Sequence, residues 1–179
     1  MRSLAQRVMT AIAATATIIA LTAVPAFATP FTGSNTQAVV AYDAMTGSLL
    51  ACSSSSLAGD APSPPGSLLV ITSASFSSCV VTGSFPVNVT AISLPWDFIA
   101  GNPLDQLTGF ALVLDVPSIG CTVTISAPGD ISGIYTSGTP NILDLDDNDL
   151  VVSSATAMCP SSLFNVGDAL RLKAQYEVS

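Results

Sequence analysis

The sequence predicts an all-β protein, an antiparallel β-sandwich or partly closed barrel of about ten short strands with two disulfides. Three observations support this fold class. Val, Ile, Thr and Ser are frequent, while Gly and Pro punctuate the chain. Several segments alternate apolar and polar residues with the period of a strand. Four cysteines follow a stretch typical of export, and exported cysteines usually form disulfides.

Residues 1–28 are expected to be a secretory signal peptide. Arg2 and Arg7 precede an uncharged, apolar run over residues 8–24, and small residues at Ala26 and Ala28 suit a signal peptidase. We therefore assign this run to export and expect no membrane span in the mature form. Residues 29–179 are expected to form a single β domain that is secreted to the extracellular medium or held in the cell wall.

Strands are expected, in chain order, at residues 38–44, 47–53, 67–72, 87–93, 110–116, 121–126, 130–136, 141–145, 149–154 and 169–178. The last alternates most clearly, with one face made by Leu170, Leu172, Ala174, Tyr176 and Val178 and the other by Arg171, Lys173, Gln175 and Glu177. Two segments, 67–72 and 110–116, are apolar on both faces. We expect a loop, a second sheet or another subunit to cover their second face. The stretches 59–66, 98–105 and 127–130 contain Gly and Pro and are expected to be loops or turns.

The four cysteines are expected to form two disulfides. A zinc site is the competing interpretation, but no two cysteines are closely spaced and the chain has no His. Three pairings are open, and we favour Cys52–Cys79 and Cys121–Cys159 because each joins neighbouring segments. Each closed loop would contribute about 3.5–4 kcal/mol in the chain-entropy model.

The acidic run NILDLDDNDLVV, residues 141–152, raises the question of a calcium site. Asp144, Asp146 and Asn148 match the first three ligand positions of a helix–loop–helix calcium loop. Asp149 then stands where that loop needs Gly, and Ala155 stands where it needs a bidentate acid. These three residues are therefore only weak metal candidates.

A plain hairpin is the favoured interpretation of the same run. Strands at 141–145 and 149–154 would be joined by a turn over 146–149, since Asp and Asn side chains bond nearby backbone groups. Trp96 is interpreted in a similar way, as a core aromatic at a strand end, with a stacking platform for a sugar ring as the alternative.

Composition excludes several function classes. Without His there is no Ser-His-Asp or Cys-His nucleophile system. The mature chain has two basic and twelve acidic residues, a formal net charge of −10, so nucleic acid is not expected as a partner. No cofactor and no catalytic residue are expected, because no phosphate-binding Gly-rich loop is present and Glu177 and Lys173 lie on a predicted outward face.

Short motifs surround the cysteines in a definite order: Phe76-x-x-Cys79, Leu94-Pro95-Trp96, Gly120-Cys121, Gly133-x-Tyr135 and Gly167-Asp168, with Cys52 before them and Cys159 between the last two. Over residues 49–178 this order resembles a group of small secreted β-rich proteins of actinobacteria whose function is unknown. The resemblance implies an exported, disulfide-bonded β protein. It implies no activity and no catalytic residue.

We expect a non-enzymatic binding or structural module that acts at the cell envelope or in the medium, with a cell-wall component or a second copy as partner. One alternative is a carboxylate-based, glycosidase-like hydrolase, which needs two acids roughly 5–10 Å apart in a cleft. A second alternative is a pore in an outer lipid layer, which needs a closed barrel with an apolar outer belt. A self-associating surface protein is the third.

Overall fold

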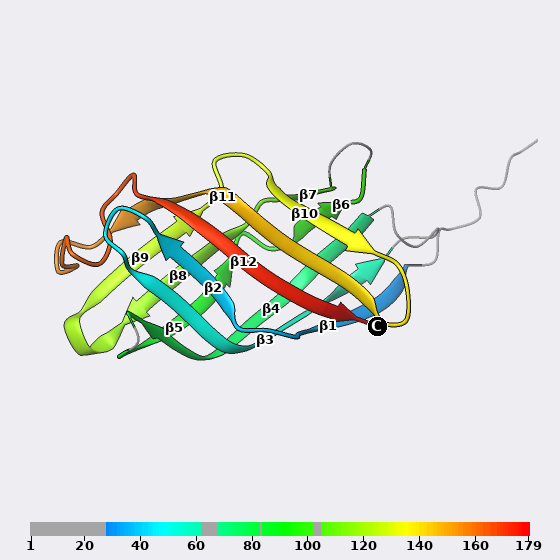
Figure 1. Cartoon of the computed structure of the whole chain (residues 1–179), viewed down its shortest axis with the longest axis horizontal. Helices are drawn as coiled ribbons and strands as arrows, with labels where there is room; N and C mark the ends of the chain where they lie inside the picture. The colour runs from blue at the N-terminus through cyan, green and yellow to red at the C-terminus, as the bar shows by residue number, and fades with distance from the viewer. Residues whose placement is uncertain (1–27, 62–67, 83, 102–104) are drawn as a thin grey trace, which may run out of the picture.

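Four long antiparallel strands form the frame of the fold: β3 (Leu49–Ala61), β4 (Leu68–Val81), β11 (Asn141–Ala155) and β12 (Ala169–Val178) (Figure 1). The computed structural model describes residues 28–61, 68–82, 84–101 and 105–179. The proposed signal peptide therefore lies outside the described residues, except for Ala28, as do most of the predicted loop at 59–66 and the centre of that at 98–105. Within the described part, no helix is long and apolar enough to cross a membrane.

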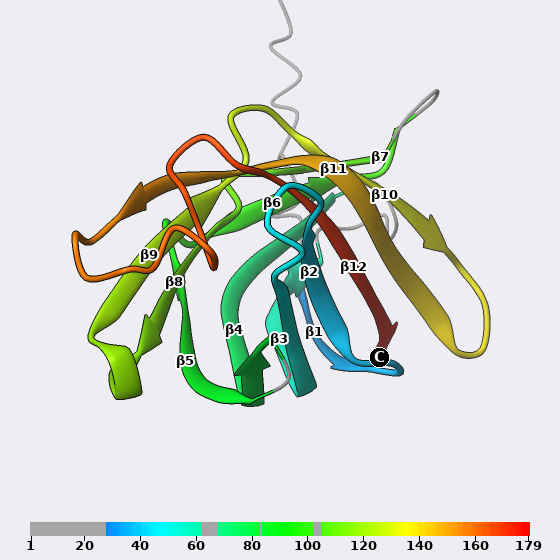
Figure 2. The same ribbon diagram turned by 60° about the vertical axis from the view of Figure 1, so that its left-hand side comes forward.

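Four further strand positions of the barrel are each occupied by two short strands that follow one another along the chain and together take the place of one long strand. The pairs are β1 (Thr29–Asn35) with β2 (Val39–Asp43), β5 (Phe85–Ile92) with β6 (Trp96–Ile99), β7 (Asp105–Thr108) with β8 (Ala111–Val116), and β9 (Cys121–Ser126) with β10 (Ile131–Thr136). Both members of a pair bond to the same neighbouring positions. Each position pairs with the next along the chain, and β12 pairs back to β1 and β2. The result is an up-and-down barrel of eight strand positions, closed all round (Figure 2).

The all-β prediction is confirmed, and of its two alternatives, a sandwich or a partly closed barrel of about ten short strands, the structure shows a barrel, which is fully closed. The strand β12 was predicted with its observed bounds, whereas only parts of β3, β4 and β11 were predicted. The middle parts of these three strands do not alternate; β3, for example, carries serine at 53–56. The strands β1, β6 and β7 were not predicted at all. They are short, polar in part or interrupted by Pro and Gly, and are held by hydrogen bonds to partners far along the chain.

Between register shifts, alternate residues of the long strands point into the barrel, where apolar side chains fill the space. The predicted inward set of β12 is buried throughout. Trp96 is 2% exposed, its ring centroid lies 4.7 Å from that of Phe110, and its Nε1–H donates to the Ile92 carbonyl at 3.0 Å. This confirms its interpretation as a core residue. Only a cavity of about 10 Å³ is left at the centre, as expected for a barrel of this size.

Two predicted strands, 67–72 and 110–116, are apolar on both faces. Their outward residues include Val70 and Val113, which are half-buried on the outside of the barrel. The described residues include no second sheet over them. Because the barrel is closed, the backbone N–H and C=O groups of every strand position have partners on both sides, and no covering layer is needed for them. The alternation alone did not indicate this closure.

Interrupted positions keep their backbone hydrogen bonds through side chains. Where β1 ends, Asn35 Oδ1 accepts from the Ser55 N–H at 2.7 Å, and its Nδ2 donates to the carbonyls of Gln37 and Ser53. Where β5 ends, the Trp96 indole takes up the Ile92 carbonyl. Buried backbone groups need hydrogen-bond partners. These side chains supply partners where a strand is interrupted, so the N–H and C=O groups there do not lack them.

One end of the barrel carries the connections β2–β3, β4–β5, β8–β9 and β11–β12, and its described residues are 44–48, 82, 84, 117–120 and 156–167; we call it the turn end. Its longest loop is tied down by the Cys121–Cys159 disulfide, and Leu163 and Phe164 from this loop are buried in the core. The second disulfide, Cys52–Cys79, joins directly paired residues of β3 and β4. Both bonds follow the pairing that chain order favoured.

Candidate functional site

The barrel interior holds no space for a ligand larger than about one water. Its few polar groups are paired, because every buried side-chain nitrogen or oxygen in the described part of the chain has a hydrogen-bond partner. The Tyr176 and Ser55 hydroxyls, for example, lie 2.9 Å apart. Burial raises the pKa of Tyr176 to about 12, and the hydrogen bond with Ser55 opposes that rise. We therefore look for a site on the outside of the barrel.

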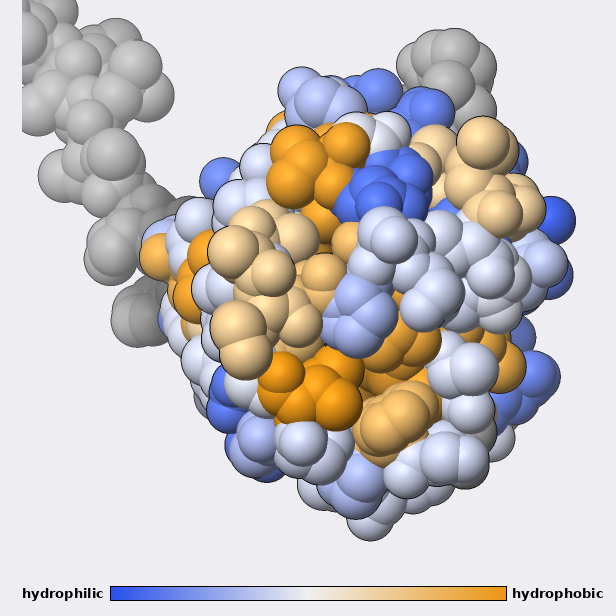
Figure 3. Space-filling model, turned by 90° about the vertical axis from the view of Figure 1, so that its left-hand side faces the viewer, coloured by the Kyte–Doolittle hydropathy of each residue, from blue (hydrophilic) through white to orange (hydrophobic). Residues whose placement is uncertain are grey.

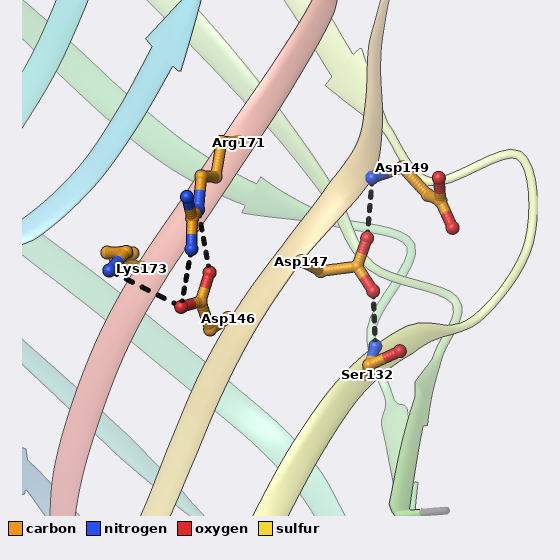
Figure 4. A network of polar contacts seen from close by, with 6 residues as sticks. All are labelled: Ser132, Asp146, Asp147, Asp149, Arg171 and Lys173. Carbon is orange, nitrogen blue, oxygen red and sulfur yellow. Dashed lines mark hydrogen bonds and ion pairs between the residues drawn. The ribbon is translucent and has the colours of Figure 1, made fainter.

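The acidic run lies within one continuous strand, which corrects the predicted hairpin (Figure 4). The strand β11 pairs with β12 on both sides of the run, and its register shifts between Asp147 and Leu150, where two residues oppose one. This is a β-bulge. Asp and Asn side chains that hydrogen-bond to nearby backbone groups are suited to a bulge as well as to a turn. The chain continues as one strand because it pairs with β12, and the sequence of the run does not reveal this pairing.

Asp147 is the buried member of the run, at 5% exposure. Its Oδ2 accepts from the Ser132 N–H at 2.6 Å and its Oδ1 from the Asp149 N–H at 2.5 Å. Ser132 lies at the start of β10, where the neighbour of β11 changes from β9 to β10. The carboxylate therefore holds the junction between two strand segments, which is a structural role.

Asp146 points outward and binds both basic residues of the described part of the chain, Arg171 and Lys173. Arg171 donates to it through two nitrogens, Nε and one Nη, each at 2.9 Å, and Lys173 Nζ lies 3.3 Å from Oδ2 (Figure 4). The hydrogen bonds from Arg171, with a smaller contribution from Lys173, lower the pKa of Asp146 below its ordinary value. This carboxyl is thus held as a carboxylate.

The weak metal candidates do not come together as a site. Asp144 is half-buried, Asp146 is bound to Arg171 and Lys173, and Asn148 lies exposed in the bulge. Among the residues that the structure describes, no three His, Cys, Asp or Glu side chains are grouped so that they could hold a metal ion.

Three hollows follow the outer face of β12. The central one, about 370 Å³, we call the β12 groove; it is lined by Gln37, Ala38, Val40, Asp144, Asp146, Lys173, Ala174 and Gln175. A hollow of about 310 Å³ adjoins Tyr42 and Arg171 on one side, and one of about 290 Å³ adjoins Thr32 and Glu177 on the other.

The β12 groove exists because β1 and β2 are interrupted. Residues 36–38 leave the ladder there, and Gln175 is held by Thr36, whose N–H donates to its carbonyl at 2.9 Å and whose hydroxyl donates to its Oε1 at 2.7 Å. The groove therefore presents amides, one ammonium and two carboxylates, of which Gln175 and Asp146 are held by neighbouring side chains. The outward set of β12 was predicted from alternation, but the interruption that hollows the surface beside it was not.

The groove also contains two neighbouring acids. Asp144 and Asp146 are two apart on one strand face, so their Cα atoms are roughly 6.5 Å apart. A glycosidase pair needs one protonated acid and one carboxylate. Asp146 is held ionised by Arg171 and so is unsuited to be the proton donor of such a pair. No protein-family model, curated protein or solved structure matches the chain.

Proposed function

We propose that the chain is an exported, non-enzymatic module that binds a hydroxyl-rich polymer of the cell envelope through the outer face of β12. One observation carries the proposal: the interior leaves about 10 Å³, whereas the groove outside leaves about 370 Å³ and is lined by polar groups. Ligand sites are concave and carry a few well-placed polar groups. The two disulfides and the absence of free cysteine in the described residues suit an oxidising, extracellular setting.

The groove chemistry favours a carbohydrate as the ligand class. The Gln37 and Gln175 amides, the Lys173 ammonium and the Asp144 carboxylate provide donors and acceptors for hydroxyl groups. Tyr42, 44% exposed in the next hollow, offers an aromatic face on which a sugar ring can stack. The net charge of −10 disfavours polyanionic ligands such as teichoic-type polymers or nucleic acid.

A pore is less well supported. A pore needs a polar lumen and an apolar outer belt. Here the lumen is filled by apolar side chains, and the outward residues include Ser54 and Ser56 on β3, Thr122 and Thr124 on β9, and the charged set of β12.

Sedimentation with insoluble, uncharged cell-wall polysaccharide tests the proposal. The mature protein should co-sediment, and the triple variant Gln37→Ala, Tyr42→Ala, Lys173→Ala should bind at least tenfold more weakly. These side chains are exposed, and Asp146 keeps Arg171 in this variant. A matched control replaces two exposed residues that do not line the groove: Asn88→Ala on β5 with Ser153→Ala near the far end of β11 should bind like the parent.

Two outcomes contradict the proposal. Equal binding by parent and triple variant would remove the groove as the site. Release of soluble sugars that Asp144→Asn abolishes would replace it by the hydrolase alternative, for which the Asp144–Asp146 spacing is the favouring observation.

A further inference from the structure

The turn end is uncharged. Its four turns contain no Asp, Glu, Lys or Arg. The nearest carboxylates are buried or half-buried and are occupied within the chain: Asp43 accepts from the Thr46 hydroxyl, Asp115 from the Thr122 hydroxyl and Asp168 from the Asn165 N–H. The opposite half carries Asp60, Asp97, Asp105 and Glu177. Charge is therefore distributed unevenly along the barrel axis.

The same end exposes large apolar side chains. Met45 is 81% exposed, Met158 69%, Val166 64% and Leu49 37%, and they come from two turns and the start of β3. Seen end-on, orange and tan residues form several areas on this surface, divided by pale residues of intermediate hydropathy and by a blue, hydrophilic group in its upper part (Figure 3). Clusters of this kind mark interaction sites, whereas single exposed apolar residues do not.

The surface is also held in place. The Cys121–Cys159 disulfide fixes the long loop, and the Thr46 hydroxyl lies 3.1 Å from the Leu163 carbonyl and 2.7 Å from the Asp43 carboxylate. Leu163 and Phe164 anchor the loop from below. A preorganised apolar surface loses little entropy when a partner binds, which favours a protein partner with a fixed shape.

We propose that the turn end binds the turn end of a second copy, giving a two-fold, end-to-end dimer. The argument is one of charge. Each mature chain carries −10, so contact through the acidic half or through β11 would bring carboxylates together. Contact through the turn ends brings only uncharged residues together and leaves the acidic halves far apart, beyond the screening length of roughly 8 Å at physiological salt. A two-fold axis also lets each patch face its own copy.

Sedimentation equilibrium of the mature protein over a concentration series tests the dimer. We expect a monomer–dimer equilibrium that high salt does not weaken, because apolar contacts strengthen as salt rises. Val166→Asp should raise the dissociation constant at least tenfold, since it places two carboxylates near each other across the interface. Ile134→Asp is the matched control: Ile134 is also 64% exposed but lies in the opposite half, and this variant should dimerise like the parent.

A monomer at all concentrations, or a dimer that Val166→Asp leaves intact, would overturn the proposal. Binding of a monomer to neutral phosphatidylcholine vesicles, lost in Val166→Asp, would instead assign this end to a lipid surface and also overturn it. The proposal does not depend on the β12 groove, so a double variant at the groove alone, Gln37→Ala with Lys173→Ala, should dimerise normally.

Discussion

Adjacent aspartates have opposite roles in β11. Asp146 is exposed and binds Arg171, whereas Asp147 is buried and binds the backbone of Ser132 and Asp149. The cause is the alternation of a strand, which sends neighbouring side chains to opposite faces. A cluster of acids in the sequence is therefore divided by the fold into a surface ion pair and a structural hydrogen-bond centre.

Tyr176 predicts how stability depends on alkaline pH. Its native pKa of about 12 lies above the ordinary value of 10.0, mainly because of burial. Below pH 10 the phenol is protonated in both the native and the unfolded protein, so its ionisation does not lower the free energy of unfolding. Between pH 10 and about 12 the unfolded state loses the proton while the native state keeps it, so the free energy of unfolding should fall by about 2.5–3 kcal/mol. Urea unfolding at a series of pH values measures this.

Tyr176→Phe is the control for that prediction. It should lack this alkaline loss, and it should be less stable at neutral pH by about 1–2 kcal/mol because Ser55 loses its buried partner. An alkaline loss of the same size in Tyr176→Phe would show that another group causes it.

At the scale of strands, the barrel depends on places where two backbones approach closely. Gly59 lies at a register shift in β3, and a Cβ at this position would be only 1.9 Å from the Val70 carbonyl oxygen on β4. No side chain can be accommodated there unless the two strands separate. Serine-rich β3 and β4 thus owe their tight pairing in part to one glycine.

Gly59→Ala is expected to destabilise the protein by about 3 kcal/mol or more, or to prevent folding. Gly129→Ala makes the same chemical change at a position with no heavy atom within 4 Å, and should alter stability by less than about 0.5 kcal/mol. Denaturant midpoints of the two variants give the comparison. A mild Gly59→Ala would mean that β3 and β4 are paired differently from the register described above.

At the scale of the molecule, the two disulfides have different tasks. The Cys52–Cys79 bond spans 27 residues within a paired hairpin, and the Cys121–Cys159 bond spans 38 residues and ties the turn-end loop to β9. The chain-entropy model gives about 3.5 and 4 kcal/mol. Both bonds stabilise the barrel, but only the second holds the surface proposed for dimerisation.

Replacing Cys121 and Cys159 together by Ala should lower the melting temperature by about 10 °C. It should also speed amide hydrogen exchange in residues 156–167 and weaken the dimer. Replacing Cys52 and Cys79 by Ala should lower the melting temperature similarly but leave exchange in that loop and the dimer near parent values. Calorimetry and exchange mass spectrometry separate the two cases, and equal exchange in both variants would contradict this division of tasks.

Alternation and composition were sufficient to predict the all-β class, the inward face of β12 and the core position of Trp96, because these follow from local periodicity and hydrophobicity. The ordered cysteines were sufficient to suggest their pairing. Closure of the barrel, the strands β1, β6 and β7, and the continuity of β11 through its acidic run depended on pairing between residues distant in sequence. The β12 groove and the uncharged turn end were likewise decided by tertiary structure. Each gathers residues from several separate segments, and only the closed ring of hydrogen bonds brings those segments side by side.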